Sequence, residues 1–202
     1  MSANNMKYLM EHETAFDSTT LGFPSIQGCH AIVYQTKSGI YGFHVAGGSG
    51  NNRWPYNARH FAQFIRQHGG GIAKGSRLYG VTYIGNNQRG YSAPARTNWK
   101  NELVEFATAL SYTGKISGYD LDKTLAQGTS AYVEYRVNGD KCDVFIETWT
   151  GPHTPDRTAN TNRQDHKGKA GTMDNPSLID LDTVVSNVTK SALVKISKDK
   201  LR

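Results

Sequence analysis

Two residues in the first quarter of the chain, Cys29 and His44, have the types and the spacing that cysteine catalysis requires. A thiolate is the reactive nucleophile, and a neighbouring imidazole favours the thiolate and can protonate a leaving group. Cys29 follows Gly28 at the start of a strand-forming run, and His44 stands fifteen residues later in the returning run. We therefore interpret Cys29 and His44 as a candidate catalytic dyad. The alternative is a buried core thiol beside a hydrogen-bonded strand histidine.

A β-hairpin is the element that must bring these two side chains together. Residues 29–35 and 40–45 are rich in strand-forming types, and a turn signal separates them. With a two-residue turn at 38–39, Cys29 and His44 face the same side of the sheet. In that strict register they lie on the order of 13 Å apart along the strand. Contact then requires a longer turn, a bulge, or a bend of Cys29 off the strand end.

The second cysteine, Cys142, favours a structural role. Asn138 and Gly139 form a preferred hairpin turn between two strand patterns within residues 130–149. That hairpin puts Cys142 on an apolar face, where a thiol packs as a small hydrophobic group. The face comprises Val133, Tyr135, Val137, Cys142, Val144 and Ile146. Because the chain has two cysteines, a disulfide framework is excluded, and we expect both thiols to be reduced.

Apolar residues recur at helical spacing in two further stretches. The first stretch follows Asn57, a suitable N-cap, and ends at Gly69. The second stretch runs from Trp99 to Leu110. Residues 78–84 form a buried strand pattern between them. This order of strands and helices predicts an α+β fold, namely an α/β sandwich with a mixed, mostly antiparallel sheet flanked by helices.

Three other stretches carry weaker patterns. Residues 1–25 are polar and irregular, so we expect a lead-in without regular structure. Residues 150–176 have few apolar side chains to offset the entropy of ordering, and we expect a flexible loop. Ser177 and Asp180 resemble a capping box, so we expect a last helix, or a helix followed by a strand. The whole chain, residues 1–202, is then a single catalytic domain.

Composition and charge narrow the classes of function. Hydrophobic residues make up 37% of the chain and charged residues 20%, which is typical of a globular protein. The formal net charge of +6 favours acidic partners. No apolar run reaches the roughly 20 residues that cross a bilayer, and the first residues lack the layout of a signal peptide. We expect a protein without a membrane partner that is cytoplasmic in the producing cell, or is secreted or injected into a target cell without a Sec signal.

Residues 26–29, Ile-Gln-Gly-Cys, precede a strand, a turn and a second strand that bears Tyr41 and His44. This pattern resembles the signature of the cytotoxic necrotizing factor type glutamine deamidases, in which Leu-Ser-Gly-Cys is followed by a catalytic His at very similar spacing. The Burkholderia lethal factor and the chemoreceptor deamidase CheD share this order on an α/β sandwich. The match covers residues 26–44, and Gln27 stands where the toxins usually have Ser.

The resemblance implies a protein-glutamine deamidase of the toxin or effector type. Cys29 would attack the side-chain carboxamide, and His44 would release ammonia and then activate the hydrolytic water. Those families orient the imidazole with an upstream Thr side chain or with a backbone carbonyl. Here Thr20, in a Thr-Leu-Gly run like that of CheD, is one candidate, and a carbonyl is the other. The implied partners are a protein substrate with a target glutamine and, for an effector, an immunity protein or a secretion-system component.

Two other classes of function stay open. The same dyad suits another Cys-His hydrolase or a transglutaminase-like acyl transferase, since an amine can replace water on the thioester. Arginines and tyrosines between residues 53 and 96 suit a basic nucleic-acid-binding module without catalysis. We disfavour that module because these residues are spread along the chain and no binding motif appears. The spacing of the remaining histidines matches no metal-binding motif, so we expect neither a metal nor a cofactor.

Overall fold

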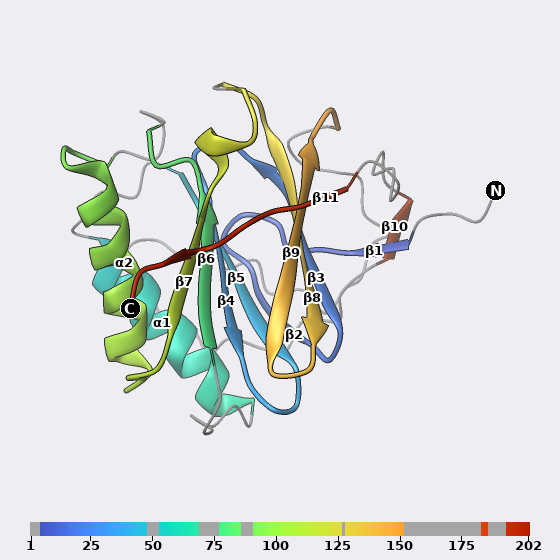
Figure 1. Cartoon of the computed structure of the whole chain (residues 1–202). Coiled ribbons are helices and arrows are strands. Elements are labelled where there is room, and N and C mark those ends of the chain that lie inside the picture. Colours follow the sequence, from blue (N-terminus) through green and yellow to red (C-terminus); the bar gives the residue numbers. More distant parts are fainter. Residues whose placement is uncertain are drawn as a thin grey trace.

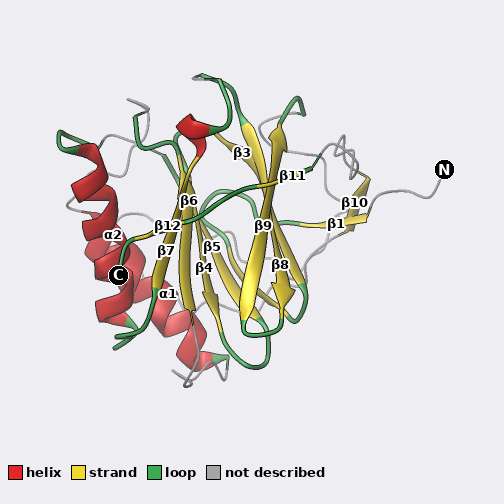
Figure 2. Ribbon diagram, in the orientation of Figure 1, coloured by secondary structure: helices red, strands yellow, loops and turns green. Residues whose placement is uncertain are grey.

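The protein folds into three layers, seen in a computed structural model (Figure 1, Figure 2). Two α-helices cover one face of a six-stranded sheet, and a four-stranded sheet packs on its other face. The α+β sandwich predicted from the sequence is confirmed. The structure describes residues 5–47, 53–68, 77–85, 91–126, 128–151, 183–185 and 193–202.

The six-stranded sheet holds the hairpin that carries the candidate dyad. All of its neighbouring strands are antiparallel except β6 and β7, which are parallel, so the sheet is mixed. Its strand order is β12 (Asp199–Lys200), β7 (Ile116–Asp120), β6 (Arg77–Thr82), β4 (His30–Gln35), β5 (Ile40–Val45) and β2 (Thr14–Asp17).

The four-stranded sheet is antiparallel and is built around the hairpin predicted near Gly139. Asn138 pairs with Lys141, so the turn residues are Gly139 and Asp140, one position later than predicted. The pairing therefore changes by two residues, an even number, so each side chain keeps its predicted face. The apolar face lies in the core between the two sheets. The strand order is β11 (Val194–Lys195), β9 (Lys141–Thr148), β8 (Ala131–Asn138) and β3 (Thr20–Ile26).

The helices α1 (Trp54–Gln67) and α2 (Ala95–Ala109) lie side by side on the outer face of the larger sheet (Figure 1). The helix α1 begins earlier than predicted because Pro55 occupies its first turn, where a missing N–H costs nothing. A short 3₁₀ helix, Leu121–Lys123, follows β7. Within the described ranges, no helix is long and apolar enough to cross a membrane.

The expectation of an irregular lead-in over residues 1–25 is wrong, because β2 and β3 lie within it or overlap it. The strand β3 escaped notice because its run Gly22-Phe23-Pro24-Ser25 resembles a turn. Its Pro24 lies at an irregularity in the pairing with β8, between Phe23 and Ile26. Proline is tolerated in a sheet at such irregularities, but in a sequence it argues against a strand.

The C-terminal expectations can be compared with the structure only in part. Of the flexible loop expected at 150–176, residues 152–176 lie outside the described residues. Most of the predicted last helix lies outside them as well. Residues Thr183–Val185 of that helix form a strand instead, β10, which pairs antiparallel with β1 (Asn5–Lys7). The helix is therefore wrong at these three positions.

Candidate active site

The ladder between β4 and β5 brings Cys29 much closer to His44 than a two-residue turn allows. Gln35 pairs with Ile40, and Ala31 pairs with His44, so the turn contains four residues, 36–39. Of the alternatives that the sequence left open, the longer turn is the one that occurs, and it removes the gap of about 13 Å. Cys29 now lies just before β4 and diagonally across the ladder from His44, a relation that separates Cα atoms by about 7–8 Å.

Both side chains face the interior of the sandwich, between the two sheets. Ala31, directly opposite His44, belongs to the apolar cluster between the sheets, and so does Cys29. The ring of Phe23, on the smaller sheet, meets the imidazole edge-on with 6.0 Å between ring centroids. Cys29 is 3% exposed and His44 is 1% exposed. The candidate dyad is therefore shielded from bulk water.

A third side chain, Glu11, reaches the site from a tight turn ahead of β2. Two backbone hydrogen bonds fix residues 10–13 against β5: the His12 N–H donates to the His44 carbonyl (2.7 Å), and the His44 N–H donates to the Glu13 carbonyl (3.0 Å). His12 adopts a φ of 69°, the left-handed conformation that lets the chain reverse here. The turn places Glu11 over the thiol of Cys29.

The reactive atoms of Glu11, Cys29 and His44 all lie within 4.8 Å of one another. The thiol of Cys29 donates a hydrogen bond to Oε1 of Glu11 at 2.7 Å. Nδ1 of His44 lies 2.8 Å from the carbonyl oxygen of Leu9. A carbonyl can only accept, so Nδ1 carries the proton and Nε2 keeps a lone pair. Nε2 has no hydrogen-bond partner among the described residues.

The surroundings set the charge of these groups. Burial lowers the pKa of His44 to about 4, although the hydrogen bond to Leu9 and the carboxylates of Glu11 and Glu13 act in the opposite direction. The imidazole is therefore neutral at neutral pH, with Nε2 ready to accept a proton. The hydrogen bond from the thiol to the Glu11 carboxylate favours protonated sulfur. The site thus pairs a thiol that donates to a carboxylate with a neutral imidazole.

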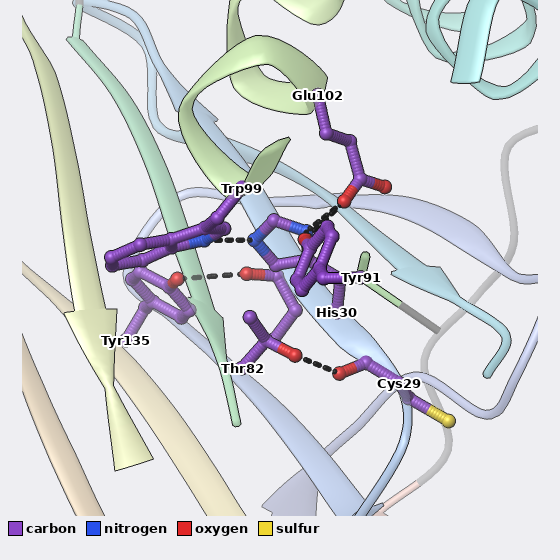
Figure 3. A network of polar contacts seen from close by, with 8 residues as sticks. Cys29, His30, Thr82, Tyr91, Trp99, Glu102 and Tyr135 are labelled. Atoms are coloured by element: carbon purple, nitrogen blue, oxygen red, sulfur yellow. Dashed lines mark hydrogen bonds and ion pairs between the residues drawn. The ribbon is translucent and has the colours of Figure 1, made fainter. Parts of the chain in front are cut away.

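The backbone around Cys29 is fixed from the neighbouring strands (Figure 3). The hydroxyl of Thr82, on β6, donates to the Cys29 carbonyl at 2.8 Å. The hydroxyl of Tyr135, on β8, donates to the Ala31 carbonyl at 3.0 Å. Figure 3 shows the sulfur of Cys29 pointing away from these contacts. The carbonyl is thereby held on one side while the thiol is directed toward Glu11.

A buried polar network holds His30, the next residue, on the opposite face of β4 (Figure 3). Nδ1 of His30 lies 3.1 Å from Oε2 of Glu102, and both side chains are fully buried. The indole N–H of Trp99 donates to Nε2 of His30 at 3.4 Å, and the Tyr91 hydroxyl donates to Glu102. Because Nε2 accepts, Nδ1 carries the proton that faces Glu102. This network ties the start of β4 to α2.

Thr20, the other predicted site residue, is not brought to the imidazole. It begins β3, and its backbone N–H donates to Oδ1 of Asp17 at 2.8 Å. Asp17 pairs with Ile40, four residues from His44 along β5, which is about 13 Å. The partner of the imidazole is the carbonyl of Leu9, the kind of group that the resemblance offered as the alternative to a threonine.

Cys142 packs among apolar side chains, as predicted. It lies in the core between the sheets and is buried. Burial raises the pKa of its thiol to about 12, against a hydrogen bond to Tyr79 that acts in the opposite direction. Such a thiol carries almost no thiolate at neutral pH and is a poor nucleophile.

Sequence reasoning missed Glu11 and Leu9. Their contacts depend on a turn that folds back onto β5, and nothing local in the sequence specifies that approach. The available signal was weak: Glu11, His12 and Glu13 are three consecutive titratable residues within a segment that otherwise looked irregular.

No protein-family model matches this chain, and no curated protein matches it either. The candidate site therefore rests on the geometry of the described residues.

Proposed function

We propose that the protein is a cysteine-dependent amide hydrolase of the glutamine-deamidase type that acts on a side-chain carboxamide of another protein. One observation carries this proposal. The thiol of Cys29 lies within 4.8 Å of a ring nitrogen of His44, whose Nδ1 is fixed by the Leu9 carbonyl and whose Nε2 is an unoccupied base. A nucleophile, a base and a group that orients the base are the parts that covalent amide hydrolysis requires.

The first half of the reaction forms a thioester. The sulfur of Cys29 attacks the carboxamide carbon, and the thiol proton passes to Nε2 of His44. The imidazolium then gives this proton to the departing nitrogen, the C–N bond breaks and ammonia leaves. In the free protein no hydrogen bond joins Nε2 to the thiol. Catalytic hydrogen bonds are often long in free enzymes and tighten once the substrate is bound.

The second half of the reaction restores the enzyme. His44 removes a proton from water, the resulting hydroxide attacks the thioester carbon, and the C–S bond breaks. The product is a glutamate side chain, and the proton returns to the sulfur of Cys29. The balance is one glutamine and one water converted to one glutamate and one ammonia. An amine that replaces the water would give acyl transfer by the same intermediate.

Glu11 assists the charged stage of this cycle. A carboxylate near the imidazole stabilises the imidazolium that forms when the thiol loses its proton, and Glu11 is one of the two carboxylates that raise the pKa of His44. As a toxin-like effector the protein would meet a substrate protein that carries the target glutamine. The formal net charge of +6 favours an acidic surface on that substrate.

The experiment is an assay of ammonia release and of glutamine-to-glutamate conversion after the purified protein is added to bacterial and eukaryotic lysates. Wild type is compared with Cys29→Ser and His44→Ala, and Cys142→Ala is the matched control for loss of a thiol. We expect conversion by wild type and by Cys142→Ala, and none by the other two. If wild type is as inactive as Cys29→Ser in both lysates, or if Cys29→Ser stays active, the proposal fails.

A further inference from the structure

The three side chains of the candidate site also form a set of metal ligands. One ligand atom from each of Glu11, Cys29 and His44 lies within 4.8 Å of the other two. A tetrahedral zinc ion binds sulfur at about 2.3 Å and nitrogen or oxygen at about 2.0–2.2 Å, so neighbouring ligand atoms stand about 3.5 Å apart. The 2.7 Å between Sγ and Oε1 must widen to that separation. Glu11 is partly exposed whereas Cys29 and His44 are buried, so Glu11 is the side chain that must move.

His44 provides a second, independent observation. Its Nδ1–H donates to the Leu9 carbonyl, and its Nε2 is buried with no hydrogen-bond partner among the described residues. Metal-binding histidines almost always donate their other ring N–H to a carbonyl, a carboxylate or a water. A buried lone pair that meets neither a proton nor a cation is unfavourable. The ring is therefore oriented as a metal ligand before any metal arrives.

We propose that Glu11, Cys29 and His44 bind a divalent cation that favours sulfur and nitrogen, with zinc as the best fit. Cysteine, histidine and carboxylate are the three ligand types of protein zinc sites, whereas magnesium and calcium select oxygen. Three protein ligands leave a fourth position for water. Binding replaces the S–H bond of Cys29 with a metal–sulfur bond and releases one proton to solvent, without any oxidation.

This site escaped the sequence analysis because its ligands do not form a local motif. They come from a turn ahead of β2, from the start of β4 and from β5, and the fold alone brings them together. The spacing rules that excluded a metal site apply to ligands within one short segment. The long-range pairing of residues 10–13 with His44 lies outside those rules.

Metal binding and deamidation exclude each other at this site. A zinc-bound thiolate is not free to attack a carboxamide, and the metal occupies the lone pair with which His44 would accept a proton. Zinc is thus an inhibitor that dissociates when the free zinc concentration falls. This consequence rests on the proposed function, whereas the binding of the metal does not.

The test is a titration of the full chain with Co²⁺ and then with Zn²⁺, after treatment with a chelator and a reductant that are both removed. Cobalt bound to a thiolate absorbs in the near ultraviolet. We expect one equivalent of Co²⁺ to produce that absorption and Zn²⁺ to abolish it. Cys29→Ser should remove the absorption, and Cys142→Ala should leave it intact. Glu11→Gln should weaken binding by at least about tenfold.

Circular dichroism of each variant establishes whether it is folded, and Glu11→Gln keeps the test informative if Cys29→Ser is not. Folded wild type that shows no cobalt–thiolate absorption overturns the inference. Absorption that depends on Cys142 overturns it as well. Ammonia release by the same metal-free protein separates the two proposals: an active enzyme that binds no cobalt contradicts this inference alone, and an inactive protein that binds cobalt through Cys29 supports it and counts against the deamidase.

Discussion

At the scale of single residues, the site combines a neutral imidazole with a thiol that donates a hydrogen bond to a carboxylate. Cys29 and His44 have different hydrogen-bond partners. The Glu11 carboxylate accepts a hydrogen bond from the thiol, and the Leu9 carbonyl accepts one from Nδ1 of His44. The sulfur lies 2.7 Å from the Glu11 carboxylate, so that negative charge opposes ionisation of the thiol directly. Reactivity of the free protein toward thiol reagents should therefore depend on Glu11.

Glu11→Gln tests this dependence. The substitution keeps the shape of the side chain and removes the negative charge beside the sulfur, so thiolate should form more readily. We expect Cys29 to be alkylated severalfold faster than in wild type, as measured by mass spectrometry of the peptide that contains it. Glu105→Gln, on helix α2, is the control for loss of one acidic side chain. A rate that is equal to or slower than that of wild type would show that Glu11 does not restrain the thiol.

Cys142 should show the opposite behaviour. Burial raises the pKa of its thiol to about 12, so at pH 8 the thiolate fraction is on the order of 10⁻⁴. In Cys29→Ser, where Cys142 is the remaining thiol, we expect almost no alkylation of the folded protein at pH 8. The reaction should accelerate as pH rises toward 12 and should be fast in denaturant at any alkaline pH. Rapid labelling of the folded variant at pH 8 would mean that Cys142 is not sealed in the core.

Part of this site was predictable from the sequence and part was not. The alternation of side chains along a strand placed Cys29 and His44 on one face of the sheet. This result does not depend on the length of the turn, provided that the register shifts by an even number of residues. The length of the turn was not predictable, because several turns suit residues 36–39 and each one sets a different distance. Glu11 was beyond prediction because its position depends on a long-range backbone contact with β5.

At the scale of elements, the start of β4 is held by β6 on one side and by helix α2 on the other. Thr82→Val tests the first of these restraints. Valine keeps the shape of threonine but removes the hydroxyl that donates to the Cys29 carbonyl, and that hydroxyl is buried. We expect the free energy of unfolding to fall by about 1–2 kcal/mol in urea titrations.

The matched control is Thr108→Val on helix α2. The Thr108 hydroxyl also donates to a carbonyl, that of Val104, but at an exposed position where water can take its place. We expect the stability of this variant to stay within about 0.5 kcal/mol of wild type. Equal losses in the two variants would indicate that the bond to Cys29 has no special structural importance.

The elements with a regular apolar period, or with an unbroken run of strand-forming residues, were found from the sequence. Both helices and the hairpin of β8 and β9 show the periods of 3.6 and 2 in their sequences. The strands β4, β5 and β6 are buried on both faces and were found instead as short runs of strand-forming residues. The strand β3 is buried on both faces and interrupted at Pro24, so its pattern resembled that of a loop. Short strands such as β2 gain stability from pairing with β5, which no local pattern reveals.

At the scale of the whole molecule, polar contacts in the core keep the two sheets in register. The hydroxyl of Tyr79, on the larger sheet, accepts from the backbone N–H of Cys142 on the smaller sheet (2.9 Å) and donates to Gln35 (3.1 Å). Tyr79→Phe removes both bonds and leaves a buried N–H without this partner. We expect a loss of about 2–3 kcal/mol in the free energy of unfolding.

The control is Tyr56→Phe on helix α1, where the tyrosine is 46% exposed. Removal of an exposed hydroxyl should change stability by less than about 0.5 kcal/mol. If Tyr79→Phe is as stable as wild type in the same urea titration, the bond between the sheets contributes nothing to the sandwich.

We propose that Cys29, and not Cys142, is the thiol that His44 activates. The most direct measurement is the rate at which iodoacetamide alkylates each cysteine in the folded, metal-free protein, followed by peptide mass spectrometry. We predict faster labelling of Cys29 than of Cys142, and a slower rate at Cys29 in folded His44→Ala. Labelling of Cys29 that is no faster than that of Cys142 would show that His44 does not activate Cys29.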